Sequence, residues 1–255
     1  MRIFLTGDTH GSFEHEVGFG RIVDFCQSQE QAGHPLTKQD IVIILGDAGI
    51  NYCHDYRDEH FKNLIRLRIP CALLCLHGNH ELRPESIRTP DGSKLYHKKP
   101  FMGGEVWCQK GFSNILFAVD GSVYNLNGLS TLAIGGAYSV DKHFRLANGY
   151  RWFPDEQPSE KTKRRVESVL EAKNNAVDVI LSHTVPFEHQ PTEFFLNGID
   201  QSTVDNSTEH WLQSIHDKTT FKHWYAGHFH CDKQKGDVQI LYTSIIPFPT
   251  NERHS

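Results

Sequence analysis

The sequence of 255 residues has no long hydrophobic run and no paired cysteine motif, and each absence excludes a class of protein. The first apolar run, residues 3–5, is far too short for the core of a secretory signal. No stretch reaches the roughly 20 apolar residues of a membrane span. The six cysteines are scattered without a CxxC pair, which favours small buried hydrophobes over a structural zinc site. We therefore expect a cytoplasmic protein without a membrane partner.

Positive charge is also in short supply. The chain has 26 Lys and Arg against 31 Asp and Glu, a net charge of -5, so nucleic acid is not a favoured partner. Walker A, GxSxG and GxGxxG signatures are missing, which argues against P-loop, serine-hydrolase and dinucleotide sites. What the sequence has in excess is histidine, 17 residues, more than core packing requires. The 38% of hydrophobic residues is typical of a globular chain.

The first third of the chain alternates predicted strands and helices. Strands are expected at 2–6, 40–45 and 70–76, with helices at 14–29 and 58–68 between them. Residues 41–45 and 71–76 are continuously apolar, as is typical of strands that helices cover on both faces. This pattern predicts a βαβαβ beginning with a parallel sheet.

The middle of the chain changes to short β-rich segments separated by turn residues, which favours a meander over 106–108, 115–119, 122–126 and 129–134. After a polar and aromatic stretch at 135–158, we expect a helix at 159–174, a strand at 177–182 and a long loop at 183–203. A short helix at 209–216 and strands at 221–226 and 238–243 follow. No repeat or linker divides the chain, so we expect one domain over 1–255.

Polar residues follow five of the predicted strands. They are Gly7-Asp8-Thr9-His10, Gly46-Asp47, Gly78-Asn79-His80-Glu81, His183 and Gly227-His228-Phe229-His230. Because carboxyl ends of neighbouring strands line one crevice in open α/β sheets, these residues are expected to form one pocket. Asp, His and Asn side chains suit a pair of borderline cations such as Mn²⁺, Fe or Zn²⁺. If the DxH and HxH segments are extended, each places its two side chains on one side.

The order of these motifs, DxH, GD, GNHE, H and GHxH, resembles the calcineurin-like metallophosphoesterase superfamily over Asp8 to His230. The resemblance implies an α/β fold in which two mixed β-sheets pack face to face with helices outside. It also implies two divalent metal ions, with Mn²⁺ favoured. One would be bound by Asp8, His10, Asp47 and His230, and the other by Asp47, Asn79, His183 and His228. His80 is left unligated and resembles the family's acid that protonates the leaving group.

The charges at such a site would suit a phosphate ester. Two divalent ions bring four positive charges against the two negative charges of Asp8 and Asp47, so the pocket attracts phosphate. Ions about 3.5 to 4 Å apart can share a water and lower its pKa towards ~7, which makes the bridging hydroxide the nucleophile. Proton donation by His80 to the leaving oxygen would contribute a rate factor of roughly 10² to 10⁴.

One branch of the superfamily is not expected. In phosphoprotein phosphatases the second motif continues as GDxxDRG, whereas Ile50 and Asn51 stand here in place of its Asp and Arg. Another residue must therefore hold the phosphate. The segment 135–145 combines glycines with Tyr138, Lys142 and Arg145, which makes it a candidate substrate loop. A solvated surface loop remains the alternative for this segment.

The leading function is a phosphomonoesterase acting on a phosphorylated small molecule, a nucleotide or a phosphoprotein. A phosphodiesterase acting on nucleotides or nucleic acid ends is the rival, because the same two-metal geometry serves both reactions. A non-catalytic scaffold is disfavoured because all seven ligand positions are present. The histidines outside the motifs are interpreted as surface or hydrogen-bonded residues; they include His54, His60, His77, His97, His189, His216 and His223.

Overall fold

The continuously apolar segments of the first third form three parallel strands, as predicted. In the computed structural model, which describes residues 1–14 and 16–251, β1 (Ile3–Thr6), β2 (Ile41–Ile44) and β3 (Ala72–Cys75) lie side by side. Helices α1 (Phe19–Gln31) and α2 (Tyr56–Arg68) connect them. The predicted βαβαβ beginning is confirmed.

The same sheet continues on both sides of these strands. β6 (Ile115–Ala118) pairs in parallel with β3, and β5 (Gly104–Gln109) and β4 (Tyr96–Phe101) follow in antiparallel order. β13 (Ile246–Pro247) pairs with β1 at the other edge. The sequence did not predict β4, because its run of Lys98, Lys99 and Pro100 does not alternate as a half-buried strand does. An edge strand tolerates both proline and exposed charge.

A second mixed sheet has the order β11 (Lys233–Lys235), β12 (Val238–Ile240), β10 (His223–Ala226), β9 (Val179–Ser182), β8 (Leu129–Ile134) and β7 (Val123–Leu126). The expected meander is therefore wrong, since β5 and β6 belong to the first sheet and the β7–β8 hairpin to the second. The chain crosses between the sheets after β6. A turn signal at that point marks a change of direction and does not show which sheet receives the next strand.

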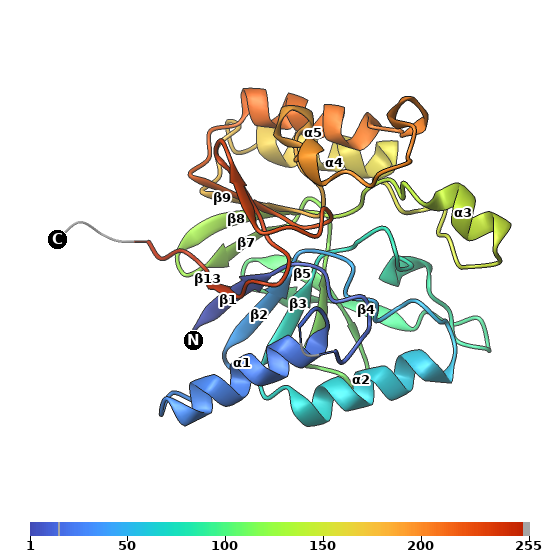
Figure 1. Cartoon of the computed structure of the whole chain (residues 1–255). Coiled ribbons are helices and arrows are strands. Elements are labelled where there is room, and N and C mark those ends of the chain that lie inside the picture. The colour runs from blue at the N-terminus through green and yellow to red at the C-terminus, as the bar shows by residue number, and fades with distance from the viewer. Residues whose placement is uncertain (15, 252–255) are drawn as a thin grey trace.

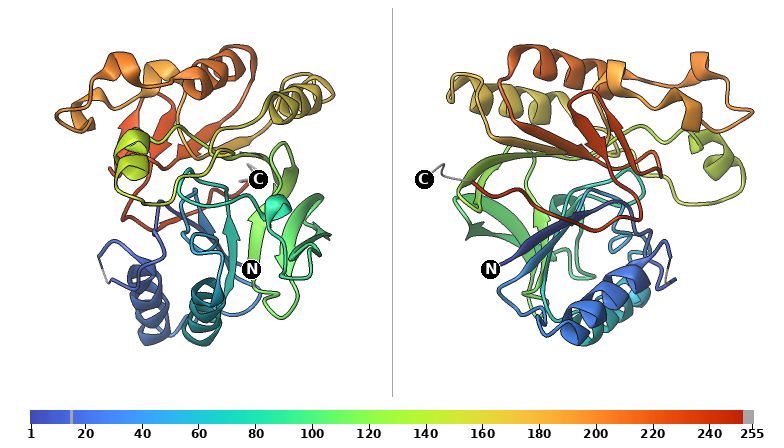
Figure 2. Two further views of the ribbon diagram at one scale, coloured as in Figure 1. Left: turned by 90° about the vertical axis from the view of Figure 1, so that its right-hand side faces the viewer. Right: turned by 60° about the vertical axis from the view of Figure 1, so that its left-hand side comes forward.

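Helices cover the outer faces of both sheets, so the molecule has four layers (Figure 1). α1 and α2 lie outside the first sheet, and α4 (Glu160–Glu171) and α5 (Ser207–Lys218) lie outside the second. Figure 2 shows these layers from two other sides. The predicted arrangement of two mixed sheets packed face to face, with flanking helices, is confirmed.

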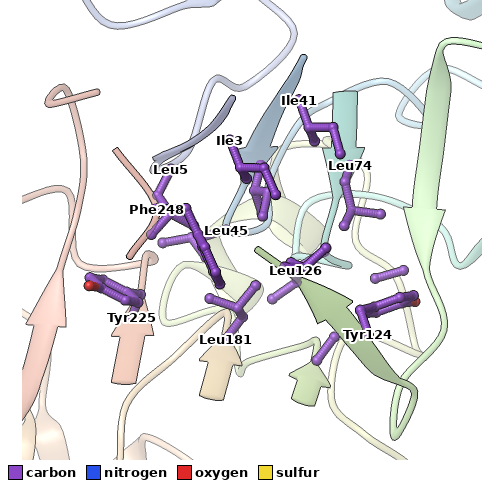
Figure 3. Packing of buried hydrophobic residues seen from close by; sticks show 14 of the residues in the cluster. Ile3, Leu5, Ile41, Leu45, Leu74, Tyr124, Leu126, Leu181, Tyr225 and Phe248 are labelled. Atoms are coloured by element: carbon purple, nitrogen blue, oxygen red, sulfur yellow. The ribbon is translucent and has the colours of Figure 1, made fainter. Parts of the chain in front are cut away.

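Hydrophobic side chains fill all three spaces between the layers. Leu5, Leu45 and Leu181 meet between the two sheets (Figure 3). Within β2, Ile43 faces this inner cluster, whereas Val42 packs in the cluster that includes α1. Both faces of the strand are therefore buried, which explains its uninterrupted apolar sequence.

Two predicted helices begin where a polar side chain caps them. Asp55 accepts a hydrogen bond from the Arg57 N–H at the start of α2, and Ser159 accepts one from the Thr162 N–H at the start of α4. α1 begins at Phe19, five residues later than predicted, because Gly18 N–H and Phe19 N–H bond to carbonyls of Glu14 and Ser12 in a turn.

The long loops contain short helical segments. α3 (Lys142–Ala147) lies in the polar and aromatic stretch at 135–158, where no helix was predicted, and single 3₁₀ turns occur at η1 (Pro84–Ser86), η2 (Phe187–His189), η3 (Thr192–Phe194) and η4 (Gln201–Thr203). The six cysteines are all unpaired, and five are buried. Among the described residues, none of the helices combines the length and apolar character needed to cross a membrane.

Candidate metal centre and substrate cavity

The segments that follow five strands meet at one end of the two sheets. β1, β2 and β3 contribute them from the first sheet, and β9 and β10 from the second. They border a cavity of about 690 Å³, which is lined by His10, Asp47, Asn79, His80, His228 and His230 among others. Asp8 and His183 are fully buried next to these residues. The structure thus brings the seven predicted ligands together.

One group of donor atoms surrounds Asp8. His10 Nε2 and His230 Nε2 are 2.8 Å apart, and the Asp8 Oδ2 atom lies 3.3 Å from His230 Nε2. Asp8 Oδ2 is buried without a hydrogen-bond partner among the described residues, while Oδ1 accepts the His228 N–H. Burial raises the pKa of Asp8, but contact with His230 and the nearby His183 lower that pKa more strongly, well below its usual value. An anionic oxygen without a donor is a suitable cation ligand.

A second group surrounds Asn79. Because His183 Nδ1 donates to the Leu45 carbonyl at 2.8 Å, the lone pair of His183 Nε2 faces Asn79 Oδ1, also at 2.8 Å. The Asn79 amide donates to Ser139 Oγ at 2.9 Å, and His228 Nδ1 lies 3.1 Å from the same Asn79 Oδ1. Two acceptors that face each other repel, and a cation that both bind removes this repulsion. The donor set therefore fits a metal ion.

Asp47 lies between the two groups. Its Oδ2 atom is 3.9 Å from His10 Nδ1 and 3.8 Å from His183 Nε2, so one carboxylate reaches both. Its Oδ1 atom accepts the backbone N–H of His80 at 2.8 Å. Burial raises the pKa of Asp47, but the neighbouring His80 and His183 lower it by more, so the carboxyl group is held in its anionic form.

The ionisation of His228 also suits a ligand. Burial lowers the pKa of His228 to about 3, and the neighbouring His183 acts in the same direction. At neutral pH the imidazole is uncharged and keeps a lone pair, which is the form that binds metal ions.

The backbone at these segments is strained rather than extended. φ is positive at His10 (47°), Asp47 (47°), His228 (70°) and His230 (49°). The expectation that alternation in an extended segment aligns the DxH and HxH side chains is therefore wrong. Tight turns aim these side chains instead, and such conformations persist where the surrounding structure enforces them.

Two glycines allow this close approach. Gly46 has a φ of +104°, and a Cβ there would overlap the His183 ring. A Cβ at Gly78 would overlap the Asp47 carboxylate. A side chain at either position would push a ligand out of place.

Two positioning residues have no signal in the sequence. Buried Arg21, inside α1, donates to the carbonyls of Gly7 and Asp8 at 2.9 and 2.8 Å and fixes the turn after β1. Buried Ser139 orients the Asn79 amide. An arginine within a helix and a serine within a loop are ordinary residues at such places, so only the fold reveals what they contact.

The candidate substrate residues are placed differently from one another. Arg145 lines the cavity, its Nη2 atom lies 3.4 Å from His80 Nε2, and its Nε donates to Asp141 Oδ2 at 2.7 Å. Tyr138 also lines the cavity. The Lys142 ammonium instead lies 4.1 Å from the centroid of the Trp152 ring. Arg145 is thus the cation of this segment that is nearest to His80 in the described structure.

His80 is mostly buried beside the ligands. Its Nε2 atom is 3.8 Å from Asp47 Oδ2. Burial and the charge of Arg145 lower the pKa of His80, and Asp47 partly offsets them. Ile50 and Asn51, which stand in place of the Asp and Arg of the phosphoprotein phosphatase motif, have other partners than the His80 ring. Ile50 is buried in the hydrophobic cluster of α1, and Asn51 Oδ1 accepts the Tyr96 hydroxyl at 2.7 Å.

Residues 1–232 match the calcineurin-like phosphoesterases. The chain belongs to this family, whose members are dinuclear metal-dependent hydrolases. The resemblance inferred from the motifs is thereby confirmed, and the chain is a phosphoesterase. A comparison with curated proteins gives no match.

Two solved structures are similar to this chain. Phosphopantetheinyl hydrolase (PptH) from Mycobacterium tuberculosis is 15% identical, with a TM-score of 0.46 over 100% of this chain and 98% of that one. TT1561 of Thermus thermophilus is 13% identical, with a TM-score of 0.45 over 94% of this chain and 88% of that one.

Proposed function

We propose that this chain is a phosphomonoesterase that uses two divalent metal ions, with Mn²⁺ favoured. The observation that carries the proposal is the pairing of an unpartnered buried carboxylate oxygen, on Asp8, with imidazole and amide acceptors that face one another. Asp8, His10, Asp47 and His230 would bind one ion, and Asp47, Asn79, His183 and His228 the other. When bound, two such ions supply the positive charge that holds a phosphate and activates water.

The residues beside the ligands have separate roles in this proposal. Arg145 would bind phosphate oxygens, since its planar guanidinium can donate two parallel hydrogen bonds. Asp141 holds that guanidinium at 2.7 Å, so little side-chain freedom remains to be lost on binding. His80 would give a ring proton to the leaving oxygen, from a position within the cavity lining.

The proposal is tested by a substrate panel on the Mn²⁺-loaded protein. An aryl monoester, an aryl diester, cyclic nucleotides, dinucleoside polyphosphates and phosphopeptides are compared by kcat/KM. The largest value for a monoester supports the proposal. The cavity of about 690 Å³ is the observation that favours a second candidate, a phosphodiesterase, because it holds more than a phosphate group. A largest value for a diester would select that function instead.

Arg145→Ala is expected to lower kcat/KM on phosphate monoesters about 10- to 150-fold. This range corresponds to the roughly 1.5 to 3 kcal/mol of a hydrogen bond to a charged group. Metal content and thermal stability should be unchanged, because the Arg145 side chain belongs to a short surface helix. The measurement is steady-state kinetics with metal analysis of the same samples.

Lys142→Ala is the matched control, since it removes a cation of the same helix that lies over Trp152. It should change kcat/KM little. Equal kinetics of wild type and Arg145→Ala on monoesters and diesters would remove the phosphate-binding role of Arg145.

One wall of the cavity is apolar. We propose that this wall contacts the alcohol part of the substrate. Phe194, Phe195, Leu196, Ile199 and Val204 line this wall. Phe194 and Leu196 are 50% and 62% exposed, so core packing does not account for them. An amphipathic phosphorylated small molecule would cover such side chains.

Phe194→Ser is therefore expected to raise KM for alkyl phosphates with long chains about fivefold. This figure is about 1 kcal/mol, a part of the value for fully burying an apolar side chain, because Phe194 is half exposed. The KM of a short alkyl phosphate should stay the same. A KM that does not depend on chain length in the wild type would show that the wall does not contact the alcohol.

A further inference from the structure

Three metal-ligating side chains meet outside the catalytic cavity. His189 ends the η2 turn, His216 lies in the last turn of α5, and Asp237 lies in the turn between β11 and β12. We name them the His189 cluster. None of the three belongs to the cavity lining. From the sequence, both histidines are interpreted as surface or hydrogen-bonded residues, because they lie outside the motifs. The three residues are 27 and 21 positions apart along the chain, and no motif joins them.

The donor atoms of the His189 cluster converge on one point. His189 Nε2 lies 3.1 Å from Asp237 Oδ1, and His216 Nε2 lies 3.0 Å from the same oxygen. Two ligand atoms bound at about 2.1 Å to one ion lie about 3.0 to 3.4 Å apart at bond angles of about 90° to 109°. The observed separations thus need little adjustment to receive an ion.

Both imidazoles direct Nε2 at the Asp237 carboxylate. His216 Nε2 lies 3.0 and 3.1 Å from the two oxygens of Asp237, and His216 Nδ1 lies 3.5 Å from Asp217 Oδ1. Without an ion these contacts are hydrogen bonds from Nε2–H to the carboxylate, and a bound ion would replace the protons. His189 Nδ1 is buried without a hydrogen-bond partner among the described residues. Two imidazoles thus share one carboxylate, and both present a lone pair to an ion once their Nε2 protons leave.

We infer that His189, His216 and Asp237 bind a third metal ion, a Zn²⁺ ion, apart from the catalytic pair. Two imidazoles and one carboxylate are zinc ligands, and sites of this composition bind Zn²⁺ more strongly than Mn²⁺. The Asp237 side chain is 50% exposed, so the ion can exchange with solvent and a water can complete its coordination.

Such an ion would hold the segment that carries the apolar wall of the cavity. His189 immediately precedes Gln190, whose carbonyl accepts a hydrogen bond from Lys235 on β11. Three residues further on, Glu193 pairs with Lys233 of the same strand. The His189 cluster would add a third link between this segment and the β11–β12 hairpin. We therefore expect Zn²⁺ to slow proteolysis within residues 193–204 several-fold.

The test is the number of zinc ions bound per chain. Wild type, Asp237→Asn, His216→Ala and the control His97→Ala are incubated with excess Zn²⁺, gel filtered and analysed for metal. His97 lies exposed on the edge strand β4, far from the cluster in sequence. Wild type and His97→Ala should bind one zinc ion more than Asp237→Asn and His216→Ala. Comparing the variants with wild type cancels the zinc held by the catalytic centre.

The location of the ion is tested on the unmodified protein. In a zinc-soaked crystal, an anomalous peak is expected within about 2.0 to 2.2 Å of His189 Nε2 and His216 Nε2. This measurement does not depend on the folding of a variant. A map without a peak between these atoms, or an equal zinc content in wild type and Asp237→Asn, would overturn the inference.

Discussion

Asp47→Asn is expected to lower kcat/KM on phosphate monoesters by about 10³-fold or more in saturating Mn²⁺, a loss of about 4 kcal/mol of transition-state stabilisation. One oxygen of Asp47 lies within 4 Å of ring nitrogens of His10 and His183, which belong to the two groups. An amide in its place keeps the shape and loses the negative charge. Of the two negative charges that Asp8 and Asp47 supply to the metal pair, one is then lost. The repulsion between the two ions is less well balanced, so metal affinity falls as well.

The fold should survive this substitution. The Asn oxygen can still accept the His80 backbone N–H that Asp47 Oδ1 accepts at 2.8 Å. The backbone carbonyl of Asp47, which accepts the N–H groups of Thr9 and His10, does not change. Circular dichroism and the thermal midpoint should therefore stay close to those of the wild type, while metal analysis shows a loss of bound Mn²⁺.

Asp91→Asn is the matched control, because Asp91 is an exposed turn residue outside the cavity lining. It makes the same chemical change without touching the site. Turnover of Asp47→Asn at the wild-type rate, with Mn²⁺ present, would show that hydrolysis does not need an ion pair bridged at this position.

The sequence predicted the three parallel strands β1 to β3 of the first sheet well because their signal is local and redundant. In β2 every residue is buried, so the run at residues 41–44 is apolar without interruption. Helices covering both faces of the strand produce that pattern directly. The assignment of β6 to the first sheet and β7 to the second has no such signal. It depends on which neighbouring strand a segment meets, and a turn sequence does not encode that choice.

The candidate site divides in the same way. Strand-end motifs predict which residues gather, because parallel strands present their carboxyl ends together. They do not predict how the residues are aimed, which here depends on positive φ angles at His10 and His230. Partners from distant segments are also invisible in the sequence. Ser139 orients Asn79 from 60 positions away.

Arg145 illustrates the limit of composition. The sequence offered Lys142 and Arg145 as neighbouring cations of one segment, with only the geometry of the guanidinium to separate them. Helix α3 begins at Lys142 and turns its ammonium to Trp152, while Arg145, one turn later, reaches His80. Residues three apart on a helix differ by about 60° around its axis, and here that turn leads the two side chains to different neighbours.

The second large effect concerns His80. His80→Ala is expected to slow hydrolysis of alkyl phosphates by roughly 10² to 10⁴ and of activated aryl phosphates by less than about 10-fold. An alkoxide is a poor leaving group and requires a proton in the transition state, whereas a nitrophenolate does not. Metal content should stay at the wild-type value, because the contact between His80 and Asp47 Oδ1 uses the backbone N–H, which alanine retains.

The measurement is a plot of log kcat/KM against the pKa of the leaving alcohol for wild type, His80→Ala and the control His97→Ala. Loss of the acid should steepen the plot for His80→Ala alone, since charge on the leaving oxygen is no longer neutralised. A purely structural role would shift the whole line down with its slope unchanged.

Arg145→Ala separates the effect of the neighbouring cation from that of the acid. The Arg145 guanidinium lies 3.4 Å from His80 Nε2, but it has no proton to give at neutral pH. That variant should therefore lower the line without steepening it, and equal slopes for His80→Ala and wild type would contradict the assignment of His80 as the acid.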